Sequence, residues 1–203
     1  MAFFRFYPTI HATTFVRGAG IYLRPPDMGD YEAWANLRAQ SRAFLTPWEP
    51  TWPADDLTRP SFRSRVRRNH QEIANDEAYP FLVFRDDDVL AGGLTLGQIK
   101  RGVVQAGTLG YWIGAPYARQ RLMSAAVRAV AVYAFATLRL HRIEASCLPH
   151  NEASIKLLER TGFIREGYAR SYLRINGVWQ DHLLYGLLET DPVPLRVTRP
   201  KKV

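Results

Sequence analysis

Residues 142–167, RIEASCLPHNEASIKLLERTGFIREG, constrain the fold more than any other part of the chain. The run up to Leu148 is typical of a β-strand, and Pro149 ends it. Asn151 then stands at a helix N-cap position, because its side-chain oxygen can accept a backbone N–H one turn further on. Gly162 follows the helix as a residue that can take the left-handed conformation. This punctuation predicts a strand, a capped helix and a turn, which by itself is an ordinary β-α-β crossover.

The rest of the chain supplies further helices and strands in a mixed order. Hydrophobic periodicity and breaker residues predict helices over residues 27–39, 59–75 and 119–138. Strands are predicted over residues 13–23, interrupted at 17–20, and over 79–84, 89–99, 105–113, 168–175 and 178–188. The dipeptide Asn176-Gly177 is a strong hairpin signal. Residues 43–53, AFLTPWEPTWP, fit a packed loop that could line a substrate entrance.

The composition fits one domain. With 203 residues, 47% of them hydrophobic, the chain can bury one substantial core; we assign residues 1–190 to a single α/β domain and residues 191–203 to a basic C-terminal tail. No run of about 18 uninterrupted apolar residues is present and the first residues lack a secretion-signal pattern, so we expect no membrane span and a cytoplasmic protein. The single cysteine, Cys147, stands in an apolar strand and is expected to be a buried thiol.

Four motifs, in this order along the chain, point to a known family. They are HRIEA, PHNxxS, GFxxEGYAR and NGxWxDH, at residues 141–145, 149–154, 162–170 and 176–182. Together they resemble the closing half of the GNAT superfamily of N-acetyltransferases, and more narrowly the ribosomal-protein-alanine N-acetyltransferases. The resemblance implies a mixed central sheet that is splayed in the middle, with helices on both faces. It also implies that acetyl-CoA is the co-substrate and enters at the splay.

Residues 117–124, YARQRLMS, occupy the place of the family's pyrophosphate loop, which is usually Q/R-x-x-G-x-G/A. Arg119 and Arg121 stand where the family has glycine. Outward-pointing arginines would add positive charge beside the phosphates, whereas a need for positive φ would strain the loop by about 1 kcal/mol or more at each position. A helix N-terminus offers free N–H groups to phosphate. We therefore expect CoA to be held by Arg119, Gln120, Arg121, Leu122, Met123 and Ser124; the alternative is a basic helix start without a cofactor.

The resemblance implies roles for the helix that begins at Asn151. Asn151 would bond the pantetheine arm of CoA and Ser154 would lie near its sulfur, which is consistent with the shared face of residues three apart on a helix. Ser154 or a bound water could protonate the departing thiolate, with Tyr168 and Tyr172 as weaker alternatives. The alternative is that neither residue has a role in function: Asn151 would then be only a helix cap, and Ser154 would face solvent.

Acetyl transfer to an amine also requires a base and a polarised carbonyl. An α-amine has a pKa of about 7.7 to 8, so much of it is protonated at neutral pH and a carboxylate acting through water would help. Glu144, on the strand that leads to Asn151, is the candidate base, although it could equally be a structural residue at a sheet edge. Backbone N–H groups near Trp112 and Ile113 would polarise the carbonyl, where a bulge is expected to open the strand.

Arginine supplies most of the net charge of +8, and five arginines crowd residues 59–68. They fit the solvated face of a surface helix with Phe62, Val66 and Ile73 buried, or a surface that contacts ribosomal RNA or CoA phosphates. These arginines are Arg59, Arg63, Arg65, Arg67 and Arg68. We expect no metal, because the three acids at residues 86–88 fit a hairpin turn and His141, His150 and His182 match no zinc motif.

These features predict an acetyl-CoA-dependent N-acetyltransferase that transfers the acetyl group directly, in a ternary complex, to a protein N-terminal amine. The alanine of a ribosomal protein is the best prediction for the acceptor. Two alternatives remain open. The acceptor could be a small amine such as an amino sugar or a polyamine, or the chain could be a degenerate fold that binds acyl-CoA weakly or serves as a ribosome-associated module.

Overall fold

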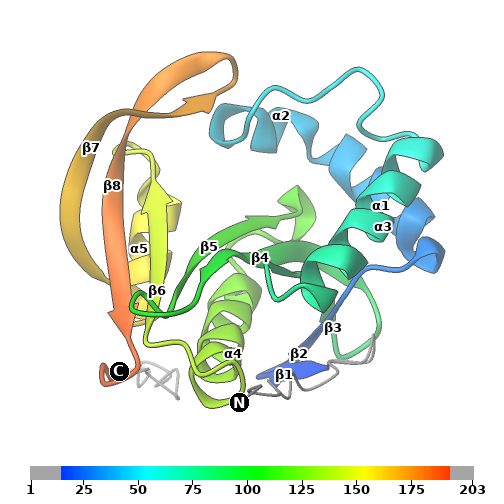
Figure 1. The fold of residues 1–203 in the computed structure, drawn as a ribbon. Coiled ribbons are helices and arrows are strands. Elements are labelled where there is room, and N and C mark those ends of the chain that lie inside the picture. Colours follow the sequence, from blue (N-terminus) through cyan, green and yellow to red (C-terminus); the bar gives the residue numbers. More distant parts are fainter. Residues whose placement is uncertain (1–14, 193–203) are drawn as a thin grey trace, which may run out of the picture.

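The computed structural model describes residues 15–192, so the expected basic tail lies outside the described residues apart from its first two positions. Its strands are β1 (Val16–Gly18), β2 (Ile21–Arg24), β3 (Tyr79–Arg85), β4 (Leu90–Lys100), β5 (Ala106–Ile113), β6 (Arg142–Cys147), β7 (Ile164–Ile175) and β8 (Val178–Leu188). Its helices are α1 (Tyr31–Gln40), α2 (Arg42–Leu45), α3 (Arg59–Ala74), α4 (Leu122–Ala136) and α5 (Glu152–Arg160), with 3-10 turns η1 (Met28–Asp30), η2 (Thr46–Trp48) and η3 (Ala115–Tyr117). The strands form one sheet in the order β1-β2-β3-β4-β5-β6-β8-β7 (Figure 1).

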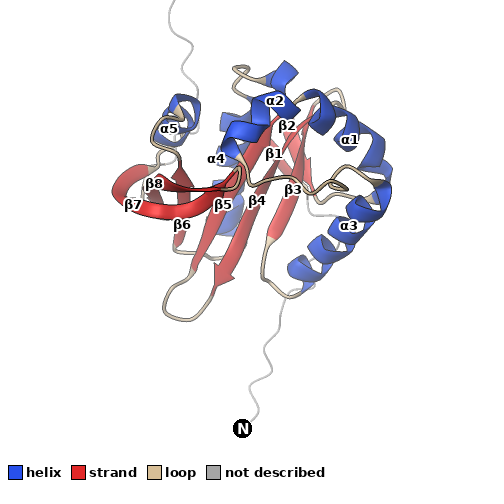
Figure 2. Ribbon diagram, turned by 90° about the horizontal axis from the view of Figure 1, so that it is seen from above, coloured by secondary structure: helices blue, strands red, loops and turns tan. Residues whose placement is uncertain are grey.

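Two hydrophobic clusters cover the two faces of this sheet. The larger cluster joins Val130 of α4 and Leu158 of α5 to Leu96 and Ile143 of the strands. The smaller cluster joins Trp34 of α1 and Phe62 of α3 to the other side of β3. Helices α1 and α3 lie side by side along one side of the strands (Figure 2). The predicted α/β fold with helices on both faces is confirmed.

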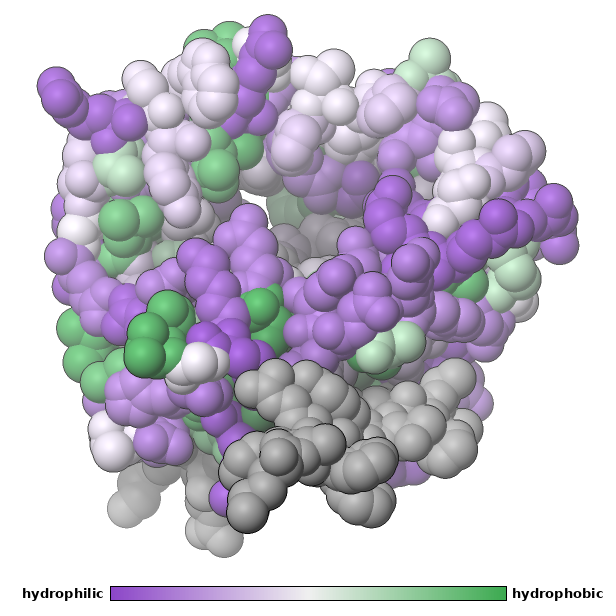
Figure 3. Space-filling model, viewed as in Figure 1, coloured by the Kyte–Doolittle hydropathy of each residue, from purple (hydrophilic) through white to green (hydrophobic). Residues whose placement is uncertain are grey.

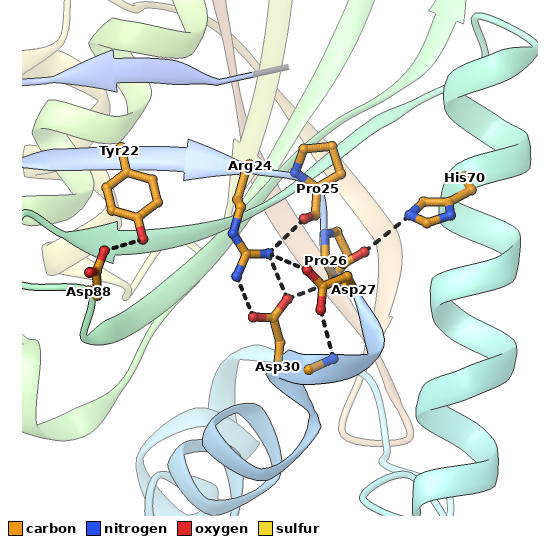
Figure 4. Close-up of polar contacts among 9 residues, drawn as sticks. Tyr22, Arg24, Pro25, Pro26, Asp27, Asp30, His70 and Asp88 are labelled. Carbon is orange, nitrogen blue, oxygen red and sulfur yellow. Dashed lines mark hydrogen bonds and ion pairs between the residues drawn. The ribbon is translucent and has the colours of Figure 1, made fainter. Parts of the chain in front are cut away.

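A network of charged groups holds the start of α1 against β2 (Figure 4). Arg24, the last residue of β2, donates hydrogen bonds of 2.8 and 2.5 Å to the carboxylate of Asp30. Asp27 and Asp30 form a capping box in the turn before α1. His70 of α3 lies 3.2 Å from the carbonyl of Pro26, which can only accept, so its ring N–H donates. These bonds fix α1 and α3 relative to the sheet.

The sheet opens between β5 and β6. Strand β6 runs parallel to β5 and pairs with it only from Ala106↔Arg142 to Leu109↔Ala145. Strand β5 nevertheless stays paired with β4 as far as Ile113. A gap therefore opens beyond Leu109 and Ala145, where Figure 1 shows the two strands parting. This is the splay that the family resemblance implied.

Two predictions near this gap are corrected. Helix α4 begins at Leu122 rather than at residue 119, because Arg119 and Arg121 both have positive φ values, which an α-helix does not accommodate. Residues 43–53, predicted as a loop, contain part of α2 and the turn η2. Among the described residues, no helix is long and apolar enough to cross a membrane.

Strand β7 begins at Ile164, four residues earlier than predicted. The β7–β8 register shifts between Arg165 and Gly167, which leaves one extra residue on β7 as a bulge. The hairpin at Asn176 and Gly177 is confirmed: both residues have positive φ, as a type I′ turn requires. The long β7–β8 hairpin rises along one side of the gap (Figure 1).

Candidate active site

The first turn of α5 borders the gap between β5 and β6. Asn151 caps this helix as predicted, since its Oδ1 accepts the backbone N–H of Ser154 at 3.1 Å. Ser154 does not face solvent: it is 9% exposed, and its Oγ lies 2.5 Å from the hydroxyl of Tyr111. Cys147 is buried at the end of β6, as predicted; burial raises the pKa of its thiol, and a hydrogen bond with Ser154 acts in the opposite direction. Two hydroxyls and a thiol thus meet at one edge of the gap.

Tyr111 is a candidate functional residue that the sequence prediction did not include. Its side chain lies on the same face of β5 as Leu109 and packs against the larger cluster. Burial raises the pKa of Tyr111 far above its ordinary value, although the hydrogen bond with Ser154 lowers it. The phenol therefore stays protonated and can donate a hydrogen bond. The sequence feature that could have identified Tyr111 is its hydroxyl, which stands on the apolar face of a strand at the point where the family's sheet opens.

The backbone of β5 presents N–H groups to the gap. The backbone N–H of Gly114 donates to the carbonyl of Ala91 on β4 at 2.8 Å. Along a strand of an antiparallel pair, successive backbone N–H groups point alternately toward the partner strand and away from it. The N–H of Trp112 therefore turns toward β4, whereas those of Tyr111 and Ile113 face the gap. The predicted bulge here is wrong, because the β4–β5 register is unbroken over this part of the pair. The strand opens only because β6 departs from it.

The loop before α4 has positive φ values at the two positions where the family has glycine, although arginine occupies both. Arg119 and Arg121 lie in the left-handed region, with φ values of 62° and 63°, and both side chains are exposed. Arg121 is the N-cap residue and makes no side-chain capping bond, so the first turn of α4 is uncapped. Gln120 instead bonds the carbonyl of Pro116 at 2.8 Å.

The predicted residues inside α4 differ in what they can offer a ligand. Met123 is buried in the larger cluster and Leu122 packs against it, so these two residues present only backbone N–H groups. Ser124 is partly buried. The start of the loop is fixed by Ser41, a fully buried residue whose Oγ accepts the N–H of Ala115 at 2.9 Å.

Glu144 lies on the other face of β6, away from the buried Ile143. Its side chain is 48% exposed and accepts a hydrogen bond of 3.0 Å from Arg142. Arg142 also binds Glu166 of β7 through both terminal nitrogens; these bonds are the first cause of the raised pKa of Arg142 and of the lowered pKa of Glu166. Gly186 of β8 leaves room for this pair, because an added Cβ would lie 2.6 Å from Glu166 and 2.7 Å from Arg142. We call this side of β6 and β8 the open face.

Residues 43–53, which contain two tryptophans, meet the β7–β8 hairpin at one end of the open face. The N–H of Asn176 donates to the carbonyl of Glu49 at 2.9 Å, and the carboxylate of Glu49 binds the buried Arg38 at 2.7 and 2.8 Å. The ring of Trp48 lies 5.6 Å from that of His150. Figure 1 shows the hairpin reaching toward α2, and Figure 3 shows a hollow below this meeting point. That residues 43–53 line a substrate entrance stays a prediction.

The arginines of residues 59–68 do not form one surface. Phe62, Val66 and Ile73 are buried, as predicted for α3. Arg65 turns inward, bonds Asp56 at 2.7 Å and lies 5.1 Å from the ring centre of Trp34. Burial lowers its pKa. The remaining four are exposed; of these, Arg59 lies 3.6 Å from Glu32 and Arg68 lies 3.7 Å from Glu72, while Arg63 and Arg67 complete the set.

A sequence profile described as "Acetyltransferase (GNAT) domain" matches residues 21–164. The chain belongs to the GNAT acetyltransferase family. It is 37% identical, over 87% of its length and 98% of the relative, to the probable N-acetyltransferase YjcK of Bacillus subtilis. It is 36% identical, over 82% of its length and 88% of the relative, to the [ribosomal protein uS5]-alanine N-acetyltransferase of Escherichia coli. The structure of Mycobacterium smegmatis RimJ in complex with CoA-disulfide matches it with a TM-score of 0.81 at 30% identity, covering 87% of this chain and 86% of that chain.

Membership of the GNAT family makes this protein an N-acetyltransferase. The gap between β5 and β6 is the place where the family resemblance implied that acetyl-CoA enters. The first turn of α5, the free edge of β5 and the loop before α4 all border that gap. Glu144 does not, because it pairs with Thr108 before the two strands part. The arginines of α3 lie over another part of the GNAT sheet, beside β3. The predicted site residues thus border the gap, except Glu144, which lies on the open face.

Proposed function

We propose that this GNAT protein uses acetyl-CoA to acetylate a protein N-terminal amine, with the alanine of a ribosomal protein as the preferred acceptor. The observation that carries the proposal is the Tyr111–Ser154 pair, which lies 2.5 Å apart beside the gap and within the first turn of a capped helix. The name of the Escherichia coli relative supports the acceptor. The proposal places the protein in the cytoplasm, where ribosomal proteins are made.

The residues around the gap fit acetyl-CoA. The uncapped first turn of α4 leaves N–H groups free for a pyrophosphate, and the exposed guanidinium groups of Arg119 and Arg121 add positive charge beside it. Asn151 would bond the pantetheine arm. The N–H groups of Ile113 and Tyr111 would bind the thioester oxygen, which strengthens the carbonyl's attraction for an amine.

Acetyl-CoA supplies the acetyl group as a thioester, and the chain handles two protons. Ser154 would donate a proton to the departing sulfur and regain one from solvent, while the hydroxyl of Tyr111 holds the Ser154 hydroxyl in position through their shared hydrogen bond. Tyr168 is less suited as the acid, because its hydroxyl is bonded to Asp181 at 2.5 Å on the exposed hairpin. Glu144 remains the candidate from sequence for the base, and its exposed carboxylate supports that role. The bond from Arg142 opposes it, since it occupies one of the carboxylate oxygens that would accept the proton.

Calorimetric titration with acetyl-CoA tests the first half of the proposal. We expect saturable binding. The absence of any heat of binding at millimolar acetyl-CoA would instead favour a degenerate fold without enzymatic activity.

The comparisons lend no support to contact between α3 and ribosomal RNA.

Mass spectrometry of ribosomal proteins from a strain that lacks the gene tests the acceptor. We expect one ribosomal protein with an N-terminal alanine to lose its acetyl group, and reintroduction of the gene to restore it. Unchanged acetylation of every ribosomal protein would exclude this acceptor and favour a small amine.

A further inference from the structure

His182 is a buried titratable residue on the open face that none of the roles above uses. It is 3% exposed, on β8. The neighbours Leu183 and Tyr185 point into the larger cluster, whereas Gly186 faces Arg142 and Glu166. Since side chains alternate along a strand, His182 shares the side of Gly186, which is the open face.

His182 lies closer to the gap than Glu144 does. Leu183 pairs with Cys147, the last residue of β6, so His182 stands one position beyond the end of that strand. Glu144 pairs with Gly186, four positions back along β8. At about 3.3 Å per residue this separation is about 13 Å. Ser154 and Cys147 lie at the same end of β6 as His182.

The hydrogen bonding of the His182 ring leaves one nitrogen as a base. Its Nδ1 lies 3.0 Å from the carbonyl oxygen of Gln180. A carbonyl can only accept a hydrogen bond, so Nδ1 carries the proton and the neutral ring has its lone pair on Nε2. The ring of Tyr172 packs against His182 edge-on, with the ring centres 5.8 Å apart, and holds its orientation. Within residues 15–192, no protein group hydrogen-bonds Nε2.

The carboxylates of Asp181, Glu144 and Glu166 are each bound to other partners. Asp181 points to the opposite side of β8, where it accepts hydrogen bonds from the hydroxyl of Tyr168 and the N–H of Ser171. On the open face itself, Arg142 holds both Glu144 and Glu166. From β7, Tyr172 presents its ring to His182. Nε2 of His182 is thus the basic nitrogen at this position that has no hydrogen-bond partner among the described residues.

We propose that Nε2 of His182 accepts the proton of the acceptor amine, an assignment that rests on the proposed function. The ammonium form of the acceptor gives one proton to His182, which frees the lone pair of its nitrogen. The neutral nitrogen then forms the new bond to the acetyl carbon, the bond from that carbon to sulfur breaks, and the second proton of the nitrogen is released to solvent. The sulfur takes its proton from Ser154. Glu144 then contributes negative charge on the open face, which attracts a cationic amine, and does not take the proton.

The test compares His182→Asn with Glu144→Gln, using acetyl-CoA and an alanine-initiated peptide with the N-terminal sequence of ribosomal protein uS5. Asparagine can keep the bond to the Gln180 carbonyl but has no basic nitrogen in place of Nε2. We expect His182→Asn to lower kcat about a hundredfold with the acetyl-CoA Kd within twofold of wild type. Glu144→Gln tests the rival base and is expected to lose less kcat than His182→Asn. Full kcat in His182→Asn, or a collapse only in Glu144→Gln, would overturn the assignment.

A pH series separates a base from a merely structural residue. The deficit of His182→Asn should shrink as pH rises past about 8, where the α-amine loses its own proton. A deficit that is constant with pH would show a structural role and overturn the assignment. If His182→Asn fails to bind acetyl-CoA, His182→Gln takes its place under the same criteria. A wild-type protein that acetylates a small amine but no peptide would overturn only the proposed acceptor, and His182→Asn is then measured with that amine. Wild type that acetylates no amine would overturn both proposals.

Discussion

Helices α4 and α5 both begin beside the gap, but their first turns are built in opposite ways. The N-cap of α5 is Asn151, whose side chain satisfies the N–H of Ser154, and Glu152 adds an acid to the first turn. The N-cap of α4 is Arg121, which is left-handed and makes no capping bond, and no acid lies in that first turn. The first turn of α5 is therefore capped by the protein itself, whereas the first turn of α4 has backbone N–H groups that are free to bind an anion.

The contrast assigns different tasks to two serines at equivalent positions. Ser124 and Ser154 are each the third residue of their helix. Ser154 is bonded to Tyr111 and beside Cys147, where a proton can be passed to sulfur. Ser124 stands in a turn that we expect to bind phosphate. Variants at the α5 start should therefore change the rate of transfer, and variants at the α4 start should change the affinity for acetyl-CoA.

The largest effect is expected from Ser154→Ala, with Ser124→Ala as its matched control. Loss of a positioned proton donor should lower kcat about a hundredfold while the KM for acetyl-CoA stays within about threefold. Ser124→Ala should leave kcat unchanged. Steady-state kinetics of both variants measure the difference, and Tyr111→Phe should resemble Ser154→Ala. Equal kcat values for the two serine variants would remove the proposed role of α5 in the chemistry.

The next effect is expected from an acid in the first turn of α4. Ser124→Asp should stabilise the free protein by about 0.5 kcal/mol, because a negative charge complements the helix dipole. The same charge should repel the phosphates and raise the acetyl-CoA Kd at least tenfold, or about 1.4 kcal/mol. Calorimetry and thermal unfolding measure the two opposite changes. On α5, removal of an acid by Glu152→Gln should leave the Kd unchanged. A Kd unaffected by Ser124→Asp would contradict phosphate binding at α4.

A smaller effect is expected from Asn151→Ala. The loss of the bond to the Ser154 N–H should lower the free energy of unfolding by about 1 kcal/mol. Asn151→Ser keeps a capping oxygen but removes the amide, so it should restore stability without restoring a contact to pantetheine. Thermal unfolding together with the KM for acetyl-CoA separates the two roles. If Asn151→Ser recovers both quantities, Asn151 is only a cap.

The two helix starts also differ in how well the sequence predicted them. The start of α5 was predicted to the residue, because asparagine at the cap and Gly162 after the helix are local signals with a known physical cause. The start of α4 was placed three residues too early, because local hydrophobic periodicity does not mark a left-handed arginine; only the family's glycines at these positions indicated a positive φ. The Tyr111–Ser154 bond joins residues 43 positions apart and exists only because β5 and β6 are neighbours in the sheet. Contacts that depend on strand order and register are not visible in local sequence.

The smallest effect separates backbone strain from charge in the α4 loop. Arg121→Gly and Arg121→Ala both remove the guanidinium group, but only glycine relieves the left-handed conformation at φ 63°. That conformation is unfavourable by about 1 to 2 kcal/mol for a residue with a Cβ, and the greater unfolded-state entropy of glycine offsets about 0.4 to 1 kcal/mol of the relief. We therefore expect the glycine variant to be more stable than the alanine variant by about 0.7 kcal/mol in denaturant unfolding. If the guanidinium group assists phosphate binding, both variants should weaken acetyl-CoA binding equally. Tighter binding by Arg121→Gly than by wild type would instead mean that the arginine obstructs the phosphates and that the missing glycine is a true defect of the loop.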